Sequence, residues 1–372
     1  MSRIERVIVK PTYSPEYPVI IGDSVLEKVS EIIQRELQQS PDKIVIFVQE
    51  PVNKIDLFNK LVENLRETYN TYIVEVPSGE TAKSIDYVLK YVHYLHDIQA
   101  TRATLIIGVG GGALGDLVGF LSSIYLRGLP LVLIPTTLLS MVDSSIGGKN
   151  AVNLFNVKNV LGTFYQPKIV IEDLRFLDTL PERELKSGLA EVVKYGVTIN
   201  PTIVKIVEND FDKILKRDRD ILIDLVKLSV ECKAWIVNLD EREEKDVRQI
   251  LNYGHTVGHG IEAAAGGALT HGECVMIGMI IESDLGVRLG YTDKLVWSKL
   301  TEISKSIGLP NKIPKSIDKR EILKKIEYDK KRVGTIIKLP VVHRLGEFEI
   351  VKMEISKLIS YLDNILEEYY EK

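Results

Sequence analysis

The sequence predicts an α/β N-terminal domain with a Rossmann-like, mainly parallel sheet, followed by a mostly α-helical C-terminal domain. Short apolar runs alternate with helical periodicity up to about Leu180, and strand patterns nearly vanish afterwards. Such alternation is typical of a parallel sheet with helices on both faces. A chain of 372 residues is long enough for more than one domain. We therefore place the domains at residues 1–180 and 181–372.

In the first domain, each element is predicted from the spacing of its apolar residues. Recurrence at helical spacing predicts helices over residues 25–37, 56–67 and 85–95. Short apolar runs predict strands at residues 43–48, 71–76, 104–109 and 131–134. A glycine-rich turn and a further helix follow the strand at 104–109.

In the second domain, helical patterns dominate. They cover residues 182–195, 221–237, 249–265 and 274–289. A short apolar stretch at 334–339 is the one strand expected there, and the charged run 240–246 is expected to be a solvated loop between helices. We find no internal repeat.

Composition excludes several classes of protein. The net charge of −4 provides no overall positive field for nucleic acid or an anionic membrane. Two cysteines exclude a disulfide framework and favour reduced thiols. The charged N-terminus shows no signal peptide, and no apolar run is long enough to span a membrane. We expect a soluble, cytoplasmic protein that binds neither nucleic acid nor membrane.

A glycine-rich stretch, residues 108–116, lies between a predicted strand and helix. Gly110, Gly112 and Gly115 satisfy the pattern G-x-G-x-x-G. Glycines at a helix N-terminus let a phosphate approach backbone amides. The alternative is a tight turn of a doubly wound sheet, because Thr136 and Thr137 occupy the place where a dinucleotide fold usually has an acid. We favour pyrophosphate binding.

Three of the six histidines fall within seventeen residues: His255, His259 and His271. His255 and His259 are four residues apart and share one face of a helix. Paired histidines suit zinc when a third ligand comes from elsewhere. Each histidine alone is more typical of a surface or satisfied core residue, so the cluster is what favours a metal or phosphate site.

Glu191 and Lys194 lie three residues apart on a predicted helix. The simplest interpretation is an exposed ion pair of a few tenths of a kcal/mol. However, Glu191 is surrounded by Leu189, Ala190, Val192 and Val193. A carboxylate in such surroundings is expected to be partly buried, and then needs a partner such as a metal.

Polar residues also gather in a Gly/Pro-rich stretch that follows predicted strands. They are Arg127, Thr136, Thr137, Asp143, Lys149, Lys158 and Asn159. Each lysine alone is more often a solubilising group, but together they indicate an anion site.

Taken together, these stretches resemble the 3-dehydroquinate synthases. The resemblance covers residues 79–293 and rests on segments in the same order: 110–116, 127–128, 135–139, 143–149, 158–162, 180–184, 190–194, 251–256 and 271–273. It implies an NAD-binding α/β domain followed by a helical metal- and substrate-binding domain. The implied substrate is a sugar-acid phosphate, 3-deoxy-D-arabino-heptulosonate 7-phosphate. The implied chemistry is transient oxidation by NAD, phosphate elimination, re-reduction and intramolecular aldol closure to 3-dehydroquinate.

The resemblance also implies the site residues. The metal, Zn²⁺ or alternatively Co²⁺, is bound by Glu191, His255 and His271. NAD is bound by Glu80, Lys83, Gly111, Gly112, Asp116, Thr136, Thr137, Leu139, Lys158, Thr179 and Glu184. Substrate binding and catalysis fall to Asp143, Lys149, Asn159, Lys194, Lys233, Glu243, Arg248, Asn252, His259 and Lys330. Arg127 is expected to reach the neighbouring subunit's site in a homodimer.

The chain departs from the family pattern at three places. The acidic-then-Asn motif after an early strand is blurred at residues 49–53. Counting from Lys233 selects Glu243 as the acidic site residue, whereas counting back from Arg248 selects Glu244. Near the C-terminus, Lys330 and Lys331 fit the final lysine motif equally well.

Three other functions compete with this interpretation. One is a cyclase for sedoheptulose 7-phosphate, which Asn159 and Asn252 disfavour. Another is a metal-dependent polyol or glycerol-phosphate dehydrogenase, which has no need for so many cations. The last is a non-catalytic NAD-binding scaffold, for which an intact metal ligand set is not expected.

Overall fold

The computed structural model describes residues 3–155, 157–331 and 334–371, with the side chains of 329–331 excluded. Its residues group into two compact units. The first comprises residues 1–180 together with 222–238, and the second comprises 181–221 together with 239–372. Each unit is described below by itself.

The first unit is built on a seven-stranded sheet in the order β1-β2-β9-β6-β5-β3-β4. Its strands are β1 (Ile4–Val9), β2 (Tyr17–Gly22), β3 (Ile44–Gln49), β4 (Thr71–Val76), β5 (Leu105–Gly110), β6 (Leu131–Pro135) and β9 (Ile169–Asp173). β1 is antiparallel to β2, and every other neighbouring pair is parallel. The predicted α/β fold with a mainly parallel sheet is therefore confirmed.

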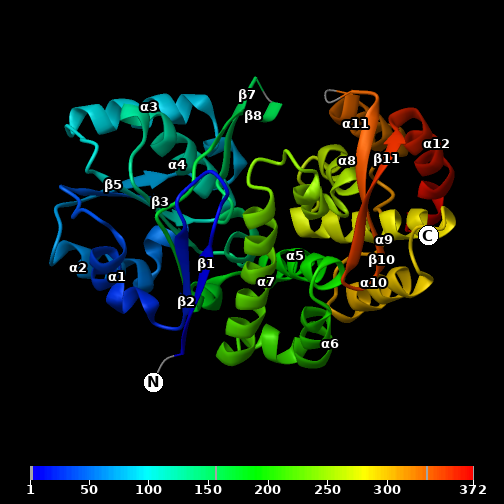
Figure 1. Ribbon diagram of the computed structural model, residues 1–372, viewed down its shortest axis with the longest axis horizontal. Coiled ribbons are helices and arrows are strands. Elements are labelled where there is room, and N and C mark those ends of the chain that lie inside the picture. The colour runs from blue at the N-terminus through cyan, green and yellow to red at the C-terminus, as the bar shows by residue number, and fades with distance from the viewer. Residues whose placement is uncertain (1–2, 156, 332–333, 372) are drawn as a thin grey trace. The chain divides into compact units, whose positions relative to one another are not determined.

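Helices cover both faces of this sheet. Figure 1 shows α1 (Val29–Glu36) and α2 (Asp56–Arg66) on one face, and α3 (Ile85–Asp97) and α4 (Gly112–Ile124) on the other. Coverage on both sides explains why β5 and β6 are buried along their whole length and read as continuous apolar runs. A separate antiparallel hairpin, β7 (Lys149–Leu154) and β8 (Val157–Phe164), packs against α4. Most of α7 (Arg219–Leu239) also belongs to this unit.

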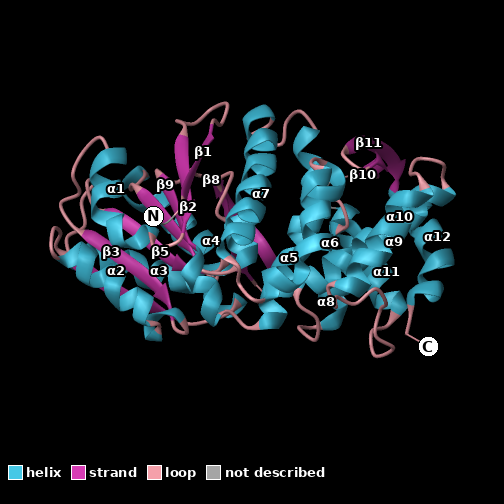
Figure 2. Cartoon of the chain, turned by 90° about the horizontal axis from the view of Figure 1, so that it is seen from below, coloured by secondary structure: helices cyan, strands magenta, loops and turns pink. Residues whose placement is uncertain are grey.

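The second unit is mainly helical, as predicted (Figure 2). Its helices are α5 (Glu182–Thr198), α6 (Pro201–Leu215), α8 (His255–Ala265), α9 (His271–Arg288), α10 (Lys294–Ser306), α11 (Lys319–Lys331) and α12 (Ile355–Ile365). One antiparallel hairpin, β10 (Ile336–Arg344) and β11 (Glu347–Glu354), completes it. Among the described residues, no helix is both long and apolar enough to cross a bilayer.

Glycines let three helices of this unit approach closely. A Cβ on Gly278 of α9 would lie 2.0 Å from the carbonyl oxygen of Gly254, at the start of α8. A Cβ on Gly272 would lie 2.0 Å from the carbonyl oxygen of Ser187 in α5. Real side chains cannot occupy such positions, so these glycines bring α5, α8 and α9 into backbone contact.

Three predictions about elements of the second unit were wrong in detail. The helix predicted over 249–265 begins only at His255, because Gly254 has φ +79° and separates it from a short 3₁₀ turn. The strand predicted at 334–339 is longer and has a partner strand that was not predicted. The charged run 240–246 is not simply solvated. Asp240 is 2% exposed because its carboxylate accepts hydrogen bonds from the backbone amides of Glu244, Lys245 and Arg248.

Candidate active site

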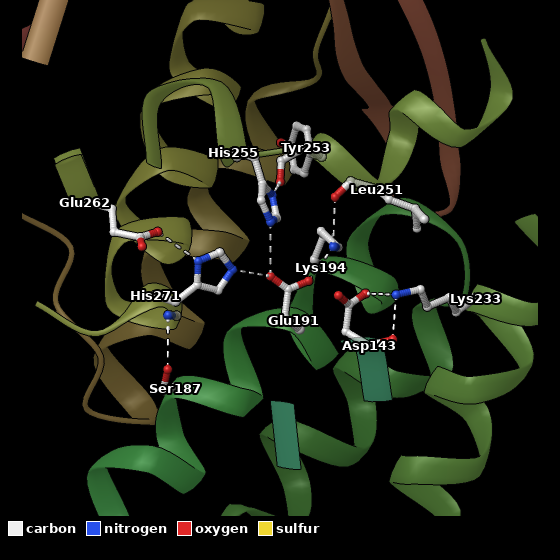
Figure 3. Close-up of polar contacts among 12 residues, drawn as sticks. Asp143, Ser187, Glu191, Lys194, Lys233, Leu251, Tyr253, His255, Glu262 and His271 are labelled. Carbon is white, nitrogen blue, oxygen red and sulfur yellow. Dashed lines mark hydrogen bonds and ion pairs between the residues drawn. The ribbon is translucent and has the colours of Figure 1, made fainter. Parts of the chain in front are cut away.

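Three side chains on separate helices of the second unit converge on one point (Figure 3). Glu191 comes from α5, His255 from the first position of α8 and His271 from the first position of α9. The Nε2 atoms of His255 and His271 lie 3.3 and 3.4 Å from Oε1 of Glu191. The structure therefore brings together the three residues expected to bind metal.

Local sequence explains how each helix presents its ligand. In α5 the run from Ser187 to Thr198 is buried, so Glu191 is carried into the interior by its apolar neighbours. At α9, Thr270 and Glu273 form a capping box that fixes the first turn and hence His271. The amide of Gly272 also donates to Oγ of Ser187, 3.0 Å away, which ties α9 to α5.

The far side of each imidazole is held in place. Nδ1 of His255 lies 3.1 Å from the carbonyl oxygen of Tyr253, and Nδ1 of His271 lies 3.0 Å from Oε2 of Glu262. Because both partners are acceptors, each Nδ1 donates to its partner, and each Nε2 is the ring atom that faces Glu191. This is the arrangement that orients histidine ligands in metal sites.

The electrostatics of the cluster favour a positive charge at its centre. Burial by itself would raise the pKa of Glu191, but Lys194 and the two histidines outweigh it and hold that pKa well below its usual range. Burial would lower the pKa of His271, yet Glu191 and Glu262 raise it to about 10. The pKa of His255 is lowered, chiefly by burial. Two carboxylates thus stabilise a cation here, whether a proton or a metal ion.

The donor set fits a divalent ion. Two imidazoles and one carboxylate match a catalytic zinc site that keeps a position open for substrate. Neither oxygen of the buried Glu191 carboxylate makes a hydrogen bond of ordinary geometry, although both lie beside cationic groups. A second group that shares His271, with His259 and Glu262, lies next to the first. His259 is exposed, so the residue that shares a helix face with His255 is not part of the buried triad.

Cationic side chains predicted to bind substrate are buried in the second unit. Lys194 is 1% exposed, contacts Oε2 of Glu191 and donates to the carbonyl oxygen of Leu251 at 2.8 Å. Arg248 is 2% exposed and donates to the carbonyl oxygen of Glu241. A buried cation is costly unless it has such partners.

Other predicted substrate residues of this unit are linked to one another. Gln249 joins Asn252 to Glu243, because its side chain accepts from Asn252 and donates to Glu243, each at 3.0 Å. Glu244 is tied to Asp240 through its backbone amide, which donates to the Asp240 carboxylate.

Glu184, which was predicted to bind NAD, is exposed in the first turn of α5. Lys330 and Lys331 end α11, and their side chains lie outside the described residues.

In the first unit, the glycine-rich turn joins β5 to α4 as predicted. Gly111 is the N-cap of α4, and its amide donates to Oε1 of Gln49 at 3.1 Å. A Cβ on Gly112 would lie 2.7 Å from Oγ of Ser144, so any larger residue at this position would force Ser144 to move. Thr137 follows β6 and exchanges hydrogen bonds with Ser140.

Lys83 organises the charged residues beside this turn. It is 5% exposed, and its Nζ lies 2.5 Å from Oδ2 of Asp116 and 2.6 Å from Oδ1 of Asn159. Burial raises the pKa of Asp116 to about 6 even though Lys83 acts to lower it. In the same unit Lys233 donates to both the carbonyl oxygen and Oδ1 of Asp143, at 2.6 and 2.7 Å.

The remaining predicted residues of the first unit lie at its surface or in turns. Arg127, Lys149, Lys158 and Thr179 are exposed, whereas Thr136 is buried and Leu139 half-buried. Glu80 is exposed at the start of a short 3₁₀ turn, Glu80–Ala82, beside Lys83.

Sequence reasoning missed several residues that hold the site in place. Glu262 could have been found, because positions 255, 259 and 262 share one helix face. Ser187 and Asn153 have no sequence signal, since their contacts are made across the fold, whereas Gln49 lies in the blurred family motif at residues 49–53.

Comparisons with known proteins bear on this arrangement. A family model described as the 3-dehydroquinate synthase N-terminal domain matches residues 73–187, and one described as the C-terminal domain matches 188–332. The 3-dehydroquinate synthase of Saccharolobus solfataricus is 37% identical over 98% of this chain and 100% of that protein. That of Thermodesulfovibrio yellowstonii is 39% identical over 92% of this chain and 96% of that protein.

Solved structures share the fold at lower identity. A 2-deoxy-scyllo-inosose synthase complexed with carbaglucose-6-phosphate, NAD⁺ and Co²⁺ has a TM-score of 0.87 at 24% identity, over 97% of this chain and 99% of that one. A 2-epi-5-epi-valiolone synthase from Streptomyces hygroscopicus, with NAD⁺ and Zn²⁺ bound, has a TM-score of 0.84 at 22% identity with the same coverage. An iron-containing alcohol dehydrogenase from Thermococcus thioreducens has a TM-score of 0.69 at 14% identity, over 94% and 98%.

Proposed function

Since this chain belongs to the 3-dehydroquinate synthase family, we propose that it converts 3-deoxy-D-arabino-heptulosonate 7-phosphate into 3-dehydroquinate and phosphate. This is the ring-forming step of the shikimate pathway, in a cytoplasmic enzyme. The observation that carries the proposal is the convergence of Glu191, His255 and His271 beside the buried Lys194.

The two domains are proposed to bind different ligands. Residues 1–180 bind NAD, supported by the glycine-rich turn at the N-terminus of α4 and by the Lys83–Asp116 pair. Residues 181–372 bind the metal and supply Lys194 and Arg248 for the substrate. When bound, a Zn²⁺ or Co²⁺ ion supplies a Lewis acid for a secondary alcohol, and NAD supplies a hydride acceptor that is regenerated each turn.

The chain's own side chains bind and orient the substrate. Lys194, fixed by Glu191 and the carbonyl of Leu251, offers a positioned ammonium next to the metal ligands. Arg248 is a second buried cation, suited to a carboxylate or phosphate. Lys233, Lys149 and His259 complete the set of cations that a doubly anionic substrate needs. The burial of Lys194 and Arg248 and the pairing of Lys233 with Asp143 keep these three cations oriented before the substrate arrives.

The enzyme acts as a homodimer in which Arg127 completes the neighbour's site. Arg127 is exposed on a turn where both it and Leu126 have left-handed φ values of 67° and 49°. Ile124 and Leu126 are each 43% exposed beside it. An exposed apolar group next to a strained, exposed arginine suits a contact between two copies of the chain.

One assay tests this function. Purified protein is mixed with Zn²⁺ or Co²⁺, NAD and the heptulosonate phosphate, and both phosphate release and the absorbance of reduced NAD are followed. We expect phosphate release without lasting NADH. Accumulating NADH without phosphate would identify a dehydrogenase instead. Turnover of sedoheptulose 7-phosphate, with none of the heptulosonate, would identify a different cyclase.

A further inference from the structure

Asn153 joins Glu80, which is expected to bind NAD, to Asn159, which is expected to bind the substrate. It lies in β7, within the hairpin that also carries Lys158 and Asn159. Its Nδ2 donates to Oε1 of Glu80 at 2.9 Å, and its Oδ1 accepts from the backbone amide of Asn159 at 2.9 Å. One amide side chain thus spans the Glu80 loop and the hairpin.

The backbone around Asn153 supports the same link. Its amide donates to the carbonyl oxygen of Lys83 at 2.8 Å, and residues 84 and 153 form an isolated parallel bridge. The β7–β8 hairpin is therefore docked against the loop of Glu80 and Lys83 by main chain as well as side chain.

A second contact joins the same two segments, because the side chain of Lys83 also contacts the side chain of Asn159. Nζ of Lys83, a buried cation, lies 2.6 Å from Oδ1 of Asn159 and 2.5 Å from Asp116. Asn159 itself has φ +57°, a left-handed conformation that asparagine adopts more readily than most L-residues. Its backbone amide donates to Asn153 and its side-chain oxygen accepts from Lys83, and these two contacts hold it in that conformation.

We propose that Asn153 is a positioning residue that couples cofactor binding to substrate binding. The inference rests on the proposed function and on the roles that the family resemblance implies, with Glu80 and Lys83 in contact with NAD and Asn159 in contact with the substrate. Ordering of the Glu80 loop by NAD fixes Asn153, which fixes the backbone of Asn159. By thermodynamic linkage, substrate binding then tightens NAD binding by the same factor.

Only an asparagine-like side chain fits this role. Its amide offers one donor and one acceptor at the required length. Alanine loses both contacts, and aspartate keeps an acceptor for the Asn159 amide but places a second carboxylate against Glu80.

Asn64 provides a matched control within the same unit. It also accepts from a backbone amide, that of Ser30 at 3.2 Å, and its Nδ2 donates to the carbonyl oxygen of Glu27 at 3.1 Å. These contacts lie in α2 and its neighbours, so Asn64→Ala removes equivalent hydrogen bonds without touching either proposed ligand site.

The test measures the dissociation constant of NAD on metal-loaded, full-length protein, with and without the phosphonate analogue of the substrate, which cannot eliminate phosphate. In the unmodified protein and in Asn64→Ala the analogue should tighten NAD binding about tenfold. In Asn153→Ala and Asn153→Asp, the ratio of the NAD dissociation constants without and with the analogue should fall towards one. The Michaelis constant for substrate should rise while kcat at saturation changes little.

The outcomes separate the inference from the function beneath it. If the unmodified protein shows no coupling, or if a folded Asn153 variant keeps the full ratio, the role of Asn153 is overturned. If the unmodified protein binds NAD but releases no phosphate from the heptulosonate, the proposed function fails instead. If Asn153→Ala does not fold, the same measurement on Asn153→Asp still tests the role of Asn153.

Discussion

Replacing Glu172 with valine should stabilise this protein at neutral pH. Glu172 lies in β9, opposite Ile21 of β2, and is fully buried. Neither of its carboxylate oxygens has a hydrogen-bond partner among the described residues. Burial raises the pKa of Glu172 well above its usual range. Valine suits a buried strand and presents no polar group.

The expected gain in the free energy of unfolding has one part that is the same at every pH and one part that depends on pH. A buried polar group without a partner costs about 1–3 kcal/mol, which valine removes at every pH. Because the folded pKa lies above the unfolded one, the folded state holds a proton that the unfolded state has released. Stability is therefore highest below the unfolded pKa and falls as pH rises towards the folded one. Between pH 5 and pH 7 this loss is at most about 2.7 kcal/mol.

Urea unfolding followed by circular dichroism at pH 5 and pH 7 tests this reasoning. Glu172→Val should be more stable than the unmodified protein at both pH values, with the larger gain at pH 7. Glu172→Gln should no longer show the pH-dependent loss of stability, but its buried amide still lacks a partner and keeps the constant cost. Glu75→Val, at an exposed position in β4 of the same sheet, is the matched control and should show neither effect. A Glu172→Val protein that is less stable at pH 7, or whose gain is equal at both pH values, would refute the argument.

Three further predictions concern the active site. His271→Ala should lose bound metal, measured by elemental analysis, and all turnover, whereas His343→Ala at a half-buried position in β10 should keep both. Glu262→Ala should weaken metal binding about 10–100-fold in competition with a chelator, and unchanged affinity would remove Glu262 from any orienting role. Arg127→Ala and His271→Ala should each be inactive alone, yet regain about one quarter of normal activity after subunit exchange in a mixture, since half of the dimers then hold one intact site. A mixture that stays inactive after exchange would argue against a shared site.

The fold class was predictable because its central strands are buried on both faces. β3, β5 and β6 read as short apolar runs, the pattern typical of strands in a parallel sheet covered on both faces. The β7–β8 hairpin was missed because neither strand contains a continuous apolar run: polar and apolar residues are interleaved in β7, and β8 is half-buried or exposed throughout. The helix predicted to begin at residue 249 was wrong because the positive φ of Gly254 breaks it.

The chemistry of the candidate site was largely readable from residue types. Apolar neighbours of Glu191 predicted its burial, and the structure confirms it. The charged run after α7 was misjudged, because Asp240 uses its carboxylate to close a turn on the amide of Arg248. Charge alone does not reveal whether a carboxylate faces water or its own backbone.

By itself, the sequence determined which side chains can do chemistry: a glycine-rich turn after a buried strand, a carboxylate among apolar residues, and a cluster of histidines. Only the tertiary structure decided which of them meet. His255 and His259 share a helix face, yet it is His271, from another helix, that joins His255 at Glu191. That choice depends on Gly272 and Gly278, which let α9 approach α5 and α8 at backbone distance. Contacts between residues so far apart in the chain depend on packing, which local periodicity does not encode.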